Sequence, residues 1–169
     1  MNKSIFIING SGGVGKDKFV ELFSQYVPTI NFSSIDKVKE IAKLIGWDGV
    51  SKTDKDRKFL SDLKRLTEDY CGMPFQSLVQ KVEEFKNDTE HNVLFLHIRE
   101  PEEIARAVEA FNANTILVTR PSVEQICSNT SDANVMNYKY DIKINNKGTL
   151  EDLDKLAKDF STIYMLYNR

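Results

Sequence analysis

The architecture of this 169-residue chain follows from one stretch, Gly10-Ser11-Gly12-Gly13-Val14-Gly15-Lys16-Asp17. This stretch comes directly after the apolar run Ile5-Phe6-Ile7-Ile8 and directly before a helical pattern at residues 18–23. A buried strand, a glycine-rich turn and a helix start, in this order, match the phosphate-binding loop GxxxxGK[ST] at every position but the last. The stretch therefore predicts a loop that holds the phosphates of a nucleoside triphosphate.

Each residue type in this phosphate loop has a chemical reason. The glycines let the backbone turn several N–H groups inward, which forms an anion-binding site at the positive end of a helix. Lys16 is expected to reach the β- and γ-phosphates of ATP as a mobile positive charge. The residues predicted to bind the nucleotide are Gly10, Ser11, Gly12, Gly13, Val14, Gly15, Lys16 and Asp17.

Asp17 stands where the motif has the Ser or Thr hydroxyl that ligates Mg²⁺. Mg²⁺ prefers oxygen ligands and keeps much of its hydration shell, so a carboxylate can hold it directly or through water. We therefore expect Mg²⁺ to accompany ATP, with Asp17 as its ligand. The alternative is a glycine-rich turn without any ligand, but such a turn rarely needs four glycines and a lysine at this spacing.

Composition narrows the class of protein and of partner. The chain is 41% hydrophobic and 28% charged with a net charge of −2, which is ordinary for one globular domain over residues 1–169. There is no basic excess to indicate nucleic acid, and no apolar stretch of membrane-spanning length. Cys71 and Cys127 lie far apart, which suggests neither zinc nor disulfides, and we expect no signal peptide before the first strand. We expect a cytoplasmic protein with a small-molecule partner.

Strand and helix patterns alternate along the chain. A helix is expected to begin at Asp36, and its apolar face is expected to carry Val38, Ile41, Ala42, Leu44 and Ile45. Apolar or alternating runs predict strands at residues 5–9, 29–32, 92–98, 114–118 and 138–144. The alternation predicts an α/β protein with the three-layer P-loop NTPase fold, in which helices cover both faces of a five-stranded parallel sheet. Ligands bind at the carboxyl ends of the strands in such sheets.

Residues 47–86 interrupt this alternation after the second strand. A helix start at Thr53-Asp54 precedes apolar residues at helical spacing, and a second helix follows Pro74. We expect a helical insertion here. Within it, Arg57 and Arg65 are candidates for binding an acceptor phosphate, because a guanidinium binds phosphate oxygens through two parallel hydrogen bonds. The alternative is that both simply lie on charged, solvated helix faces.

Charged residues also follow the predicted strands of the sheet. Arg99 and Arg120 each come just after a strand, where they are expected to place positive charge over a transferring phosphoryl group. Surface salt bridges are the alternative for both arginines. Asp36 is expected to contact the acceptor or the metal shell, or else to cap its helix. His97 lies in an apolar strand and is assigned no role.

With these residues, the chain resembles the nucleoside monophosphate kinases of the P-loop kinase group, most closely the phage and bacterial deoxynucleoside monophosphate kinases. The resemblance implies transfer of the γ-phosphate of ATP to a (deoxy)nucleoside monophosphate with Mg²⁺. It also implies that the insertion at 47–86 binds the acceptor and that residues 121–137 form a mobile lid. The resemblance rests on the loop ending Gly15-Lys16-Asp17 and on residues 32–40, 98–103, 119–121, 131–132 and 145–153.

Position by position, the resemblance implies that the phosphate loop binds ATP, that Asp36 and the insertion meet the acceptor, and that Arg99 and Arg120 face the phosphoryl groups. The chain differs from the family in two places. The family's third strand often ends with an acidic residue two positions before the arginine, where this chain has His97. The expected lid at 121–137 contains no arginine or lysine.

Other activities stay open from the sequence alone. The chain also resembles the animal phosphomevalonate kinases in its Gly-Lys-Asp loop, so the acceptor of a kinase can be another phosphorylated small molecule. A nucleotide hydrolase needs an acidic metal ligand at the end of an apolar strand, and no strand offers one. A nucleotide-binding protein without catalysis is consistent with Asp17 and with the absence of arginine and lysine from the expected lid.

Overall fold

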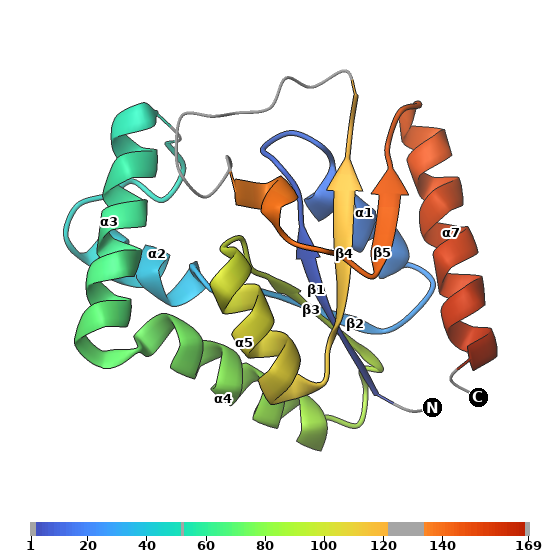
Figure 1. The fold of residues 1–169 in the computed structure, drawn as a ribbon, viewed down its shortest axis with the longest axis horizontal. Coiled ribbons are helices and arrows are strands. Elements are labelled where there is room, and N and C mark those ends of the chain that lie inside the picture. Colours follow the sequence, from blue (N-terminus) through green and yellow to red (C-terminus); the bar gives the residue numbers. More distant parts are fainter. Residues whose placement is uncertain (1–2, 52, 122–133, 168–169) are drawn as a thin grey trace.

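A parallel sheet forms the centre of the protein in the computed structural model, which describes residues 3–51, 53–121 and 134–167 (Figure 1). Its strand order is β2-β3-β1-β4-β5. The chain leaves the central strand β1 first toward β3 and β2, and then crosses to β4 and β5. Ligands bind in such sheets at the carboxyl ends of the strands where this reversal occurs. The strands are β1 (Ser4–Asn9), β2 (Thr29–Ser33), β3 (Val93–His97), β4 (Asn114–Thr119) and β5 (Ile142–Asn145).

Helices cover both faces of the sheet (Figure 1). Helices α1 and α7 pack on one face, and α4 and α5 pack on the other. Helices α2 and α3 lie farther out, and α3 contacts both α2 and α4. The helices are α1 (Lys16–Phe23), α2 (Asp36–Leu44), α3 (Asp54–Cys71), α4 (Met73–Asn87), α5 (Pro101–Phe111), the short 3₁₀ helix η1 (Asn134–Asn137) and α7 (Leu150–Tyr167).

The central strand β1 is apolar at successive positions, without alternation, because both of its faces are buried. Phe6 and Ile8 point into the core formed with α1 and α7, whereas Ile5 and Ile7 point into the core formed with α4 and α5. A strand of a parallel sheet that is covered on both faces needs apolar residues at every position. The predicted three-layer α/β fold with a five-stranded parallel sheet is thus confirmed.

The predicted apolar face of α2 is only partly correct. Val38 and Ala42 are fully buried, but Leu44 and Ile45 are 85% and 63% exposed. The reason is that α2 ends at Leu44, and the chain then turns away at Gly46, whose φ is 107°. The last two apolar residues therefore extend beyond the helices that cover the start of α2.

The predicted helical insertion forms as two helices with different environments. Helix α3 begins with a capping box, in which Thr53 Oγ1 accepts from the backbone N–H of Asp56 and the Asp56 carboxylate accepts from the backbone N–H of Thr53. None of the residues of α3 is fully buried. Helix α4, in contrast, places Phe85 and other apolar residues in the core on the sheet. Helix α4 therefore anchors the insertion, and α3 stands at its outer side. The lid expected at 121–137 falls largely on residues 122–133, which lie outside the described residues.

Candidate active site

The phosphate loop is held in place by buried side chains of neighbouring strands. Gly15 precedes α1 with φ of 94°, and a Cβ atom there would lie 2.6 Å from Nδ2 of Asn146. That Nδ2 atom donates to the backbone oxygen of Val14 at 2.8 Å, and the backbone N–H of Asn146 donates to Thr119 O at 2.7 Å. Asn146, just after β5, therefore fixes the end of the loop, at a position where only glycine fits.

Asn9, at the end of β1, fixes the start of the loop. It is completely buried, and its Oδ1 accepts from the backbone N–H of Gly10 at 2.8 Å. Its Nδ2 donates to the backbone oxygen of Arg99 at 3.1 Å and to Tyr140 Oη at 2.7 Å. Burial raises the pKa of Tyr140 to about 12, so its hydroxyl keeps its proton and donates to Val135 O. Asn9 thereby joins the phosphate loop to the segment that carries Arg99.

A cavity of about 710 Å³ opens in front of the phosphate loop. It extends from the loop along the carboxyl ends of β2 and β3 to α2 and α3 of the outer layer. Its size falls in the range of sites for small molecules, about 300–1,000 Å³. The residues that line it are Ile8, Gly12, Gly13, Lys16, Asp17, Asn31, Phe32, Ser33, Ser34, Ile35, Asp36, Lys39, Arg57, Leu60, Ser61, Lys64, His97, Ile98 and Arg99.

Most of the site residues expected from the sequence meet in this cavity. Those that line it are Gly12, Gly13, Lys16, Asp17, Asp36, Arg57 and Arg99. Lys16 begins α1 and is 8% exposed, so its charge is held inside the site. Among the described residues, the expected site residues that do not belong to the lining are Gly10, Ser11, Val14, Gly15, Arg65 and Arg120. Arg65 lies 3.6 Å from Asp69 on the exposed side of α3, and Arg120 follows β4 on the other side of β1.

Asp36 connects the end of β2 to the start of α2. Its Oδ2 accepts from the backbone N–H of Ser33 at 2.8 Å, and its Oδ1 lies 3.4 Å from Lys39 Nζ. The side chain does not cap the helix, since the residue before α2 is Ile35 and no side-chain cap bond forms there. The carboxylate therefore closes the turn behind β2 and holds the Lys39 ammonium at the wall of the cavity.

His97 lies in the cavity although the sequence assigned it no role. Its side chain is only 11% exposed, with Nδ1 3.4 Å from Asp17 Oδ1 and Nε2 2.7 Å from Asn31 Oδ1. Burial lowers the pKa of His97 to about 4, against the opposing effect of the Asp17 charge, so the ring is neutral at neutral pH. The signal was its position at the carboxyl end of a buried strand, two residues before Arg99.

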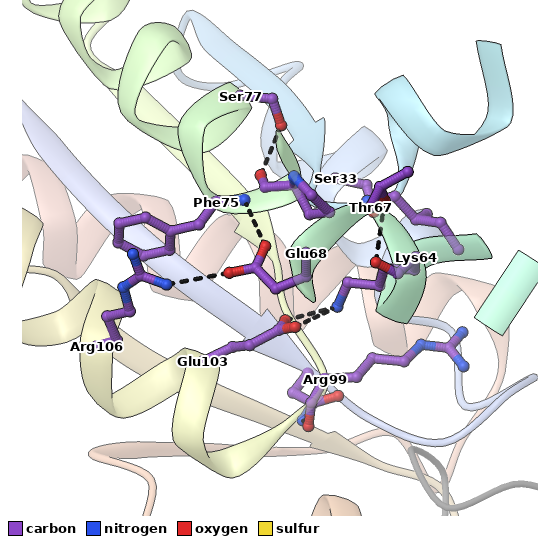
Figure 2. A network of polar contacts seen from close by, with 12 residues as sticks. Ser33, Lys64, Thr67, Glu68, Phe75, Ser77, Arg99, Glu103 and Arg106 are labelled. Atoms are coloured by element: carbon purple, nitrogen blue, oxygen red, sulfur yellow. Dashed lines mark hydrogen bonds and ion pairs between the residues drawn. The ribbon is translucent and has the colours of Figure 1, made fainter. Parts of the chain in front are cut away.

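Lys64 is a second cavity residue that the sequence did not single out. Its Nζ donates to both carboxylate oxygens of Glu103 at 2.7 and 2.6 Å. Figure 2 shows Lys64 on α3 and Glu103 on α5 reaching toward each other, next to a second link in which Arg106 donates to Glu68 at 3.1 Å. These two ion pairs join the insertion to the helix that follows Arg99, so they fix one wall of the cavity.

The donor atoms near the loop fit a divalent cation only in part. No group of three or more His, Cys, Asp or Glu side chains that could hold a metal occurs among the described residues. Asp17 supplies one carboxylate at the cavity, and its side chain is 80% exposed. Mg²⁺ in kinase sites is bound by one or two protein ligands together with phosphates and water. The residues present therefore suit a cation that arrives with a nucleotide.

No described helix is both long and apolar enough to cross a membrane.

Known proteins match this chain by structure but not by sequence. No protein-family model and no curated protein matches it. TT1252 from Thermus thermophilus has a TM-score of 0.52 at 18% identity, covering 95% of this chain and 97% of its own. A sugar kinase from Janibacter has a TM-score of 0.52 at 12% identity, covering 94% of each chain. At these identities the likeness shows the fold alone, an α/β chain with helices on both faces of a parallel sheet.

Proposed function

We propose that this protein transfers the γ-phosphoryl group of ATP to a phosphorylated small molecule, specifically a (deoxy)nucleoside monophosphate. The observation that carries the proposal is the continuous cavity that runs from the phosphate loop to a basic wall. That wall carries Arg57 together with Lys39 and Lys64, whose charges are partly balanced by Asp36 and Glu103. A hydrolase needs no such second basic region, whereas a kinase with a phosphorylated acceptor does.

The site residues have distinct proposed roles. The N–H groups of the phosphate loop and Lys16 bind the β- and γ-phosphates of ATP and neutralise their charge. An oxygen of the acceptor phosphate attacks the γ-phosphorus while the bond to the bridging oxygen breaks, which releases ADP. Arg99, which lines the cavity, and Arg120, which follows β4 outside the lining, are proposed to stabilise the charge on the phosphoryl group from the two sides of β1. Asp17 would hold a divalent cation that is bound with ATP, and this cation would supply further charge neutralisation.

The acceptor is proposed to lie against the insertion. Arg57 binds its phosphate, because a guanidinium matches two phosphate oxygens. Phe32 and Leu60, which also line the cavity, offer apolar surface to a base, and Asp36 is within the same wall to accept from a sugar hydroxyl. Solved structures with this fold include a sugar kinase, which is consistent with small-molecule phosphoryl transfer.

The experiment that tests this proposal is ADP formation from ATP and divalent cation with a panel of ribo- and deoxyribonucleoside monophosphates. We expect turnover with one subset of acceptors and its loss, on the order of 10²–10³-fold or more, in Lys16→Ala. Equal ADP formation with and without acceptors would indicate a hydrolase instead. A flat panel with ATP bound would direct the search to other phosphorylated acceptors, such as those of the phosphomevalonate kinases.

The acceptor role of Arg57 has a matched control on the same helix. Lys58, the next residue, is 76% exposed and pairs with Asp62. Arg57→Ala should raise the KM for the acceptor about tenfold or more, because a charge-assisted pair of hydrogen bonds is lost, while Lys58→Ala should leave it unchanged. Equal effects of the two substitutions would place the acceptor elsewhere.

A further inference from the structure

Asp17 and His97 come from two different elements and lie next to each other in the lining of the cavity. Asp17 is the second residue of α1, and His97 is the last residue of β3. Their atoms Oδ1 and Nδ1 are 3.4 Å apart. Both residues line the cavity together with Lys16, at the end where the phosphates of ATP are proposed to bind. The pair therefore lies where a nucleotide-bound cation is expected.

The hydrogen bond on the far side of the imidazole determines which nitrogen faces Asp17. His97 Nε2 lies 2.7 Å from Oδ1 of Asn31, an oxygen that can only accept, so Nε2 carries the ring proton. With the proton on Nε2, Nδ1 is the ring atom that faces the Asp17 carboxylate. One nitrogen and one oxygen that can both bind a cation therefore lie side by side at the phosphate end of the cavity.

We propose that Asp17 and His97 together ligate the divalent cation that accompanies ATP, and that the nitrogen ligand makes the site prefer a first-row transition ion such as Mn²⁺ over Mg²⁺. This inference rests on the proposed ATP-dependent function. Mg²⁺ strongly prefers oxygen ligands, whereas imidazole nitrogen suits transition ions. The remaining ligands are phosphate oxygens and water, in keeping with the absence of a larger donor cluster among the described residues.

The geometry of the pair agrees with shared ligation. Two donor atoms at about 2.1 Å from one ion lie about 3.0 Å apart in octahedral geometry and about 3.4 Å apart in tetrahedral geometry. The observed 3.4 Å separation of Asp17 Oδ1 and His97 Nδ1 equals the tetrahedral value and is a few tenths of an ångström above the octahedral one, so the two atoms need to move only slightly closer to bind one octahedral ion. The bond from Nε2 to Asn31 is the outer contact that metal-binding histidines make, because it fixes the tautomer and the orientation of the ring.

The histidine content of the chain gives a clean test. There are two histidines, and His91 pairs instead with Asp88 at 2.9 Å, on the segment before β3. The protein would be loaded with Mn²⁺ and the β,γ-methylene analogue of ATP, and pulsed electron paramagnetic resonance would detect any nitrogen bonded to the Mn²⁺. We expect an imidazole nitrogen signal in the wild type and in His91→Gln, and its loss in His97→Gln.

A second measurement compares the affinities of the two ions. His97→Asp replaces the nitrogen ligand by an oxygen ligand. The ratio of the Mn²⁺ affinity to the Mg²⁺ affinity, measured with the same analogue, should therefore fall about tenfold, an effect of the size that changes around a metal site produce. Circular dichroism would establish that each variant is folded. A bound Mn²⁺–nucleotide complex without the imidazole signal, or one whose signal persists in His97→Gln, overturns this inference and leaves the kinase proposal standing. Failure of the wild type to bind the analogue overturns both.

Discussion

Gly15 is the residue at which the phosphate loop and the segment after β5 come closest. Its φ of 94° is unfavourable for any residue with a side chain, and a Cβ atom would also lie 2.6 Å from Asn146 Nδ2. Gly46 has a similar φ of 107°, but a Cβ atom there would meet none of the described atoms within 4 Å. Alanine substitutions at the two glycines therefore distinguish the effect of backbone strain, which both share, from the effect of crowding, which occurs only at Gly15.

Gly15→Ala should weaken ATP binding about tenfold or more, because Asn146 must move and its hydrogen bond to the loop is lost. Gly46→Ala should lose only the stability that backbone strain costs, about 1 kcal/mol, and keep the affinity for ATP. Titration calorimetry with ATP and denaturant unfolding would measure the two quantities. Normal ATP affinity in Gly15→Ala would contradict this explanation of the loop.

At the scale of single residues, the sequence predicted the phosphate loop but not the two asparagines, Asn9 and Asn146, that hold it in place. The loop is recognisable because its residues are adjacent in the chain. Asn9 and Asn146 act through buried contacts with Arg99 O and Val14 O, far away in the sequence, and a lone asparagine carries no pattern. His97 was missed for the same reason, since its partners Asp17 and Asn31 come from other elements.

Between helices, the ion pair of Lys64 and Glu103 joins α3 of the insertion to α5. Their side chains are 15% and 25% exposed, so solvent screens this pair less than the other pairs on α3. Figure 2 shows the neighbouring link, in which Arg106 also lies over the ring of Phe75 at 3.6 Å. Because Lys64 lines the cavity, the pair fixes the distance between the acceptor wall and the segment that carries Arg99.

Glu103→Gln should raise the KM for the acceptor about fivefold with a smaller change in kcat, corresponding to about 1 kcal/mol of lost positioning. Asp62→Asn, which breaks the exposed pair with Lys58 on the same helix, is the control and should change neither constant. Steady-state kinetics with the acceptor found in the panel of monophosphates would provide both values. An unchanged acceptor KM in Glu103→Gln would show that the link does not position the wall.

The order of the helices and strands was predictable from periodicity, but which side of each outer helix points to the core or to the cavity was not. Periodicity gave α2 an apolar face that included Leu44 and Ile45, yet both are exposed because the helix ends and the chain turns at Gly46. Likewise, Arg65 and Lys64 are adjacent on α3, and Lys64 lines the cavity only because its side of the helix points toward the cavity. The orientation of α3 depends on how it packs on α2 and α4, and the periodicity of a single sequence does not specify this packing.

For the whole molecule, the insertion and the sheet share one core. Phe85 of α4 is 1% exposed and lies in the same cluster as Leu94 and Leu96 of the central sheet. Trp47, the single tryptophan, follows α2 at the edge of the insertion. The insertion is therefore expected to unfold together with the sheet rather than separately.

Trp47 fluorescence and far-ultraviolet circular dichroism should report the same midpoint of denaturant unfolding. Phe85→Ala should lower the free energy of unfolding by about 3–5 kcal/mol, because a large buried side chain leaves a cavity, and should shift both signals together. An earlier fluorescence transition in the wild type would mean that the insertion unfolds on its own.

Phosphoryl transfer is the proposed activity of the whole molecule, so the decisive measurement follows the phosphoryl group itself. ATP radiolabelled at the γ-phosphate would be incubated with the protein, a divalent cation and each nucleoside monophosphate, and the products would be separated by chromatography. We predict label in a nucleoside diphosphate for one subset of acceptors, and none with Lys16→Ala. Label that appears only as inorganic phosphate, at the same rate without an acceptor, would contradict the proposed transfer.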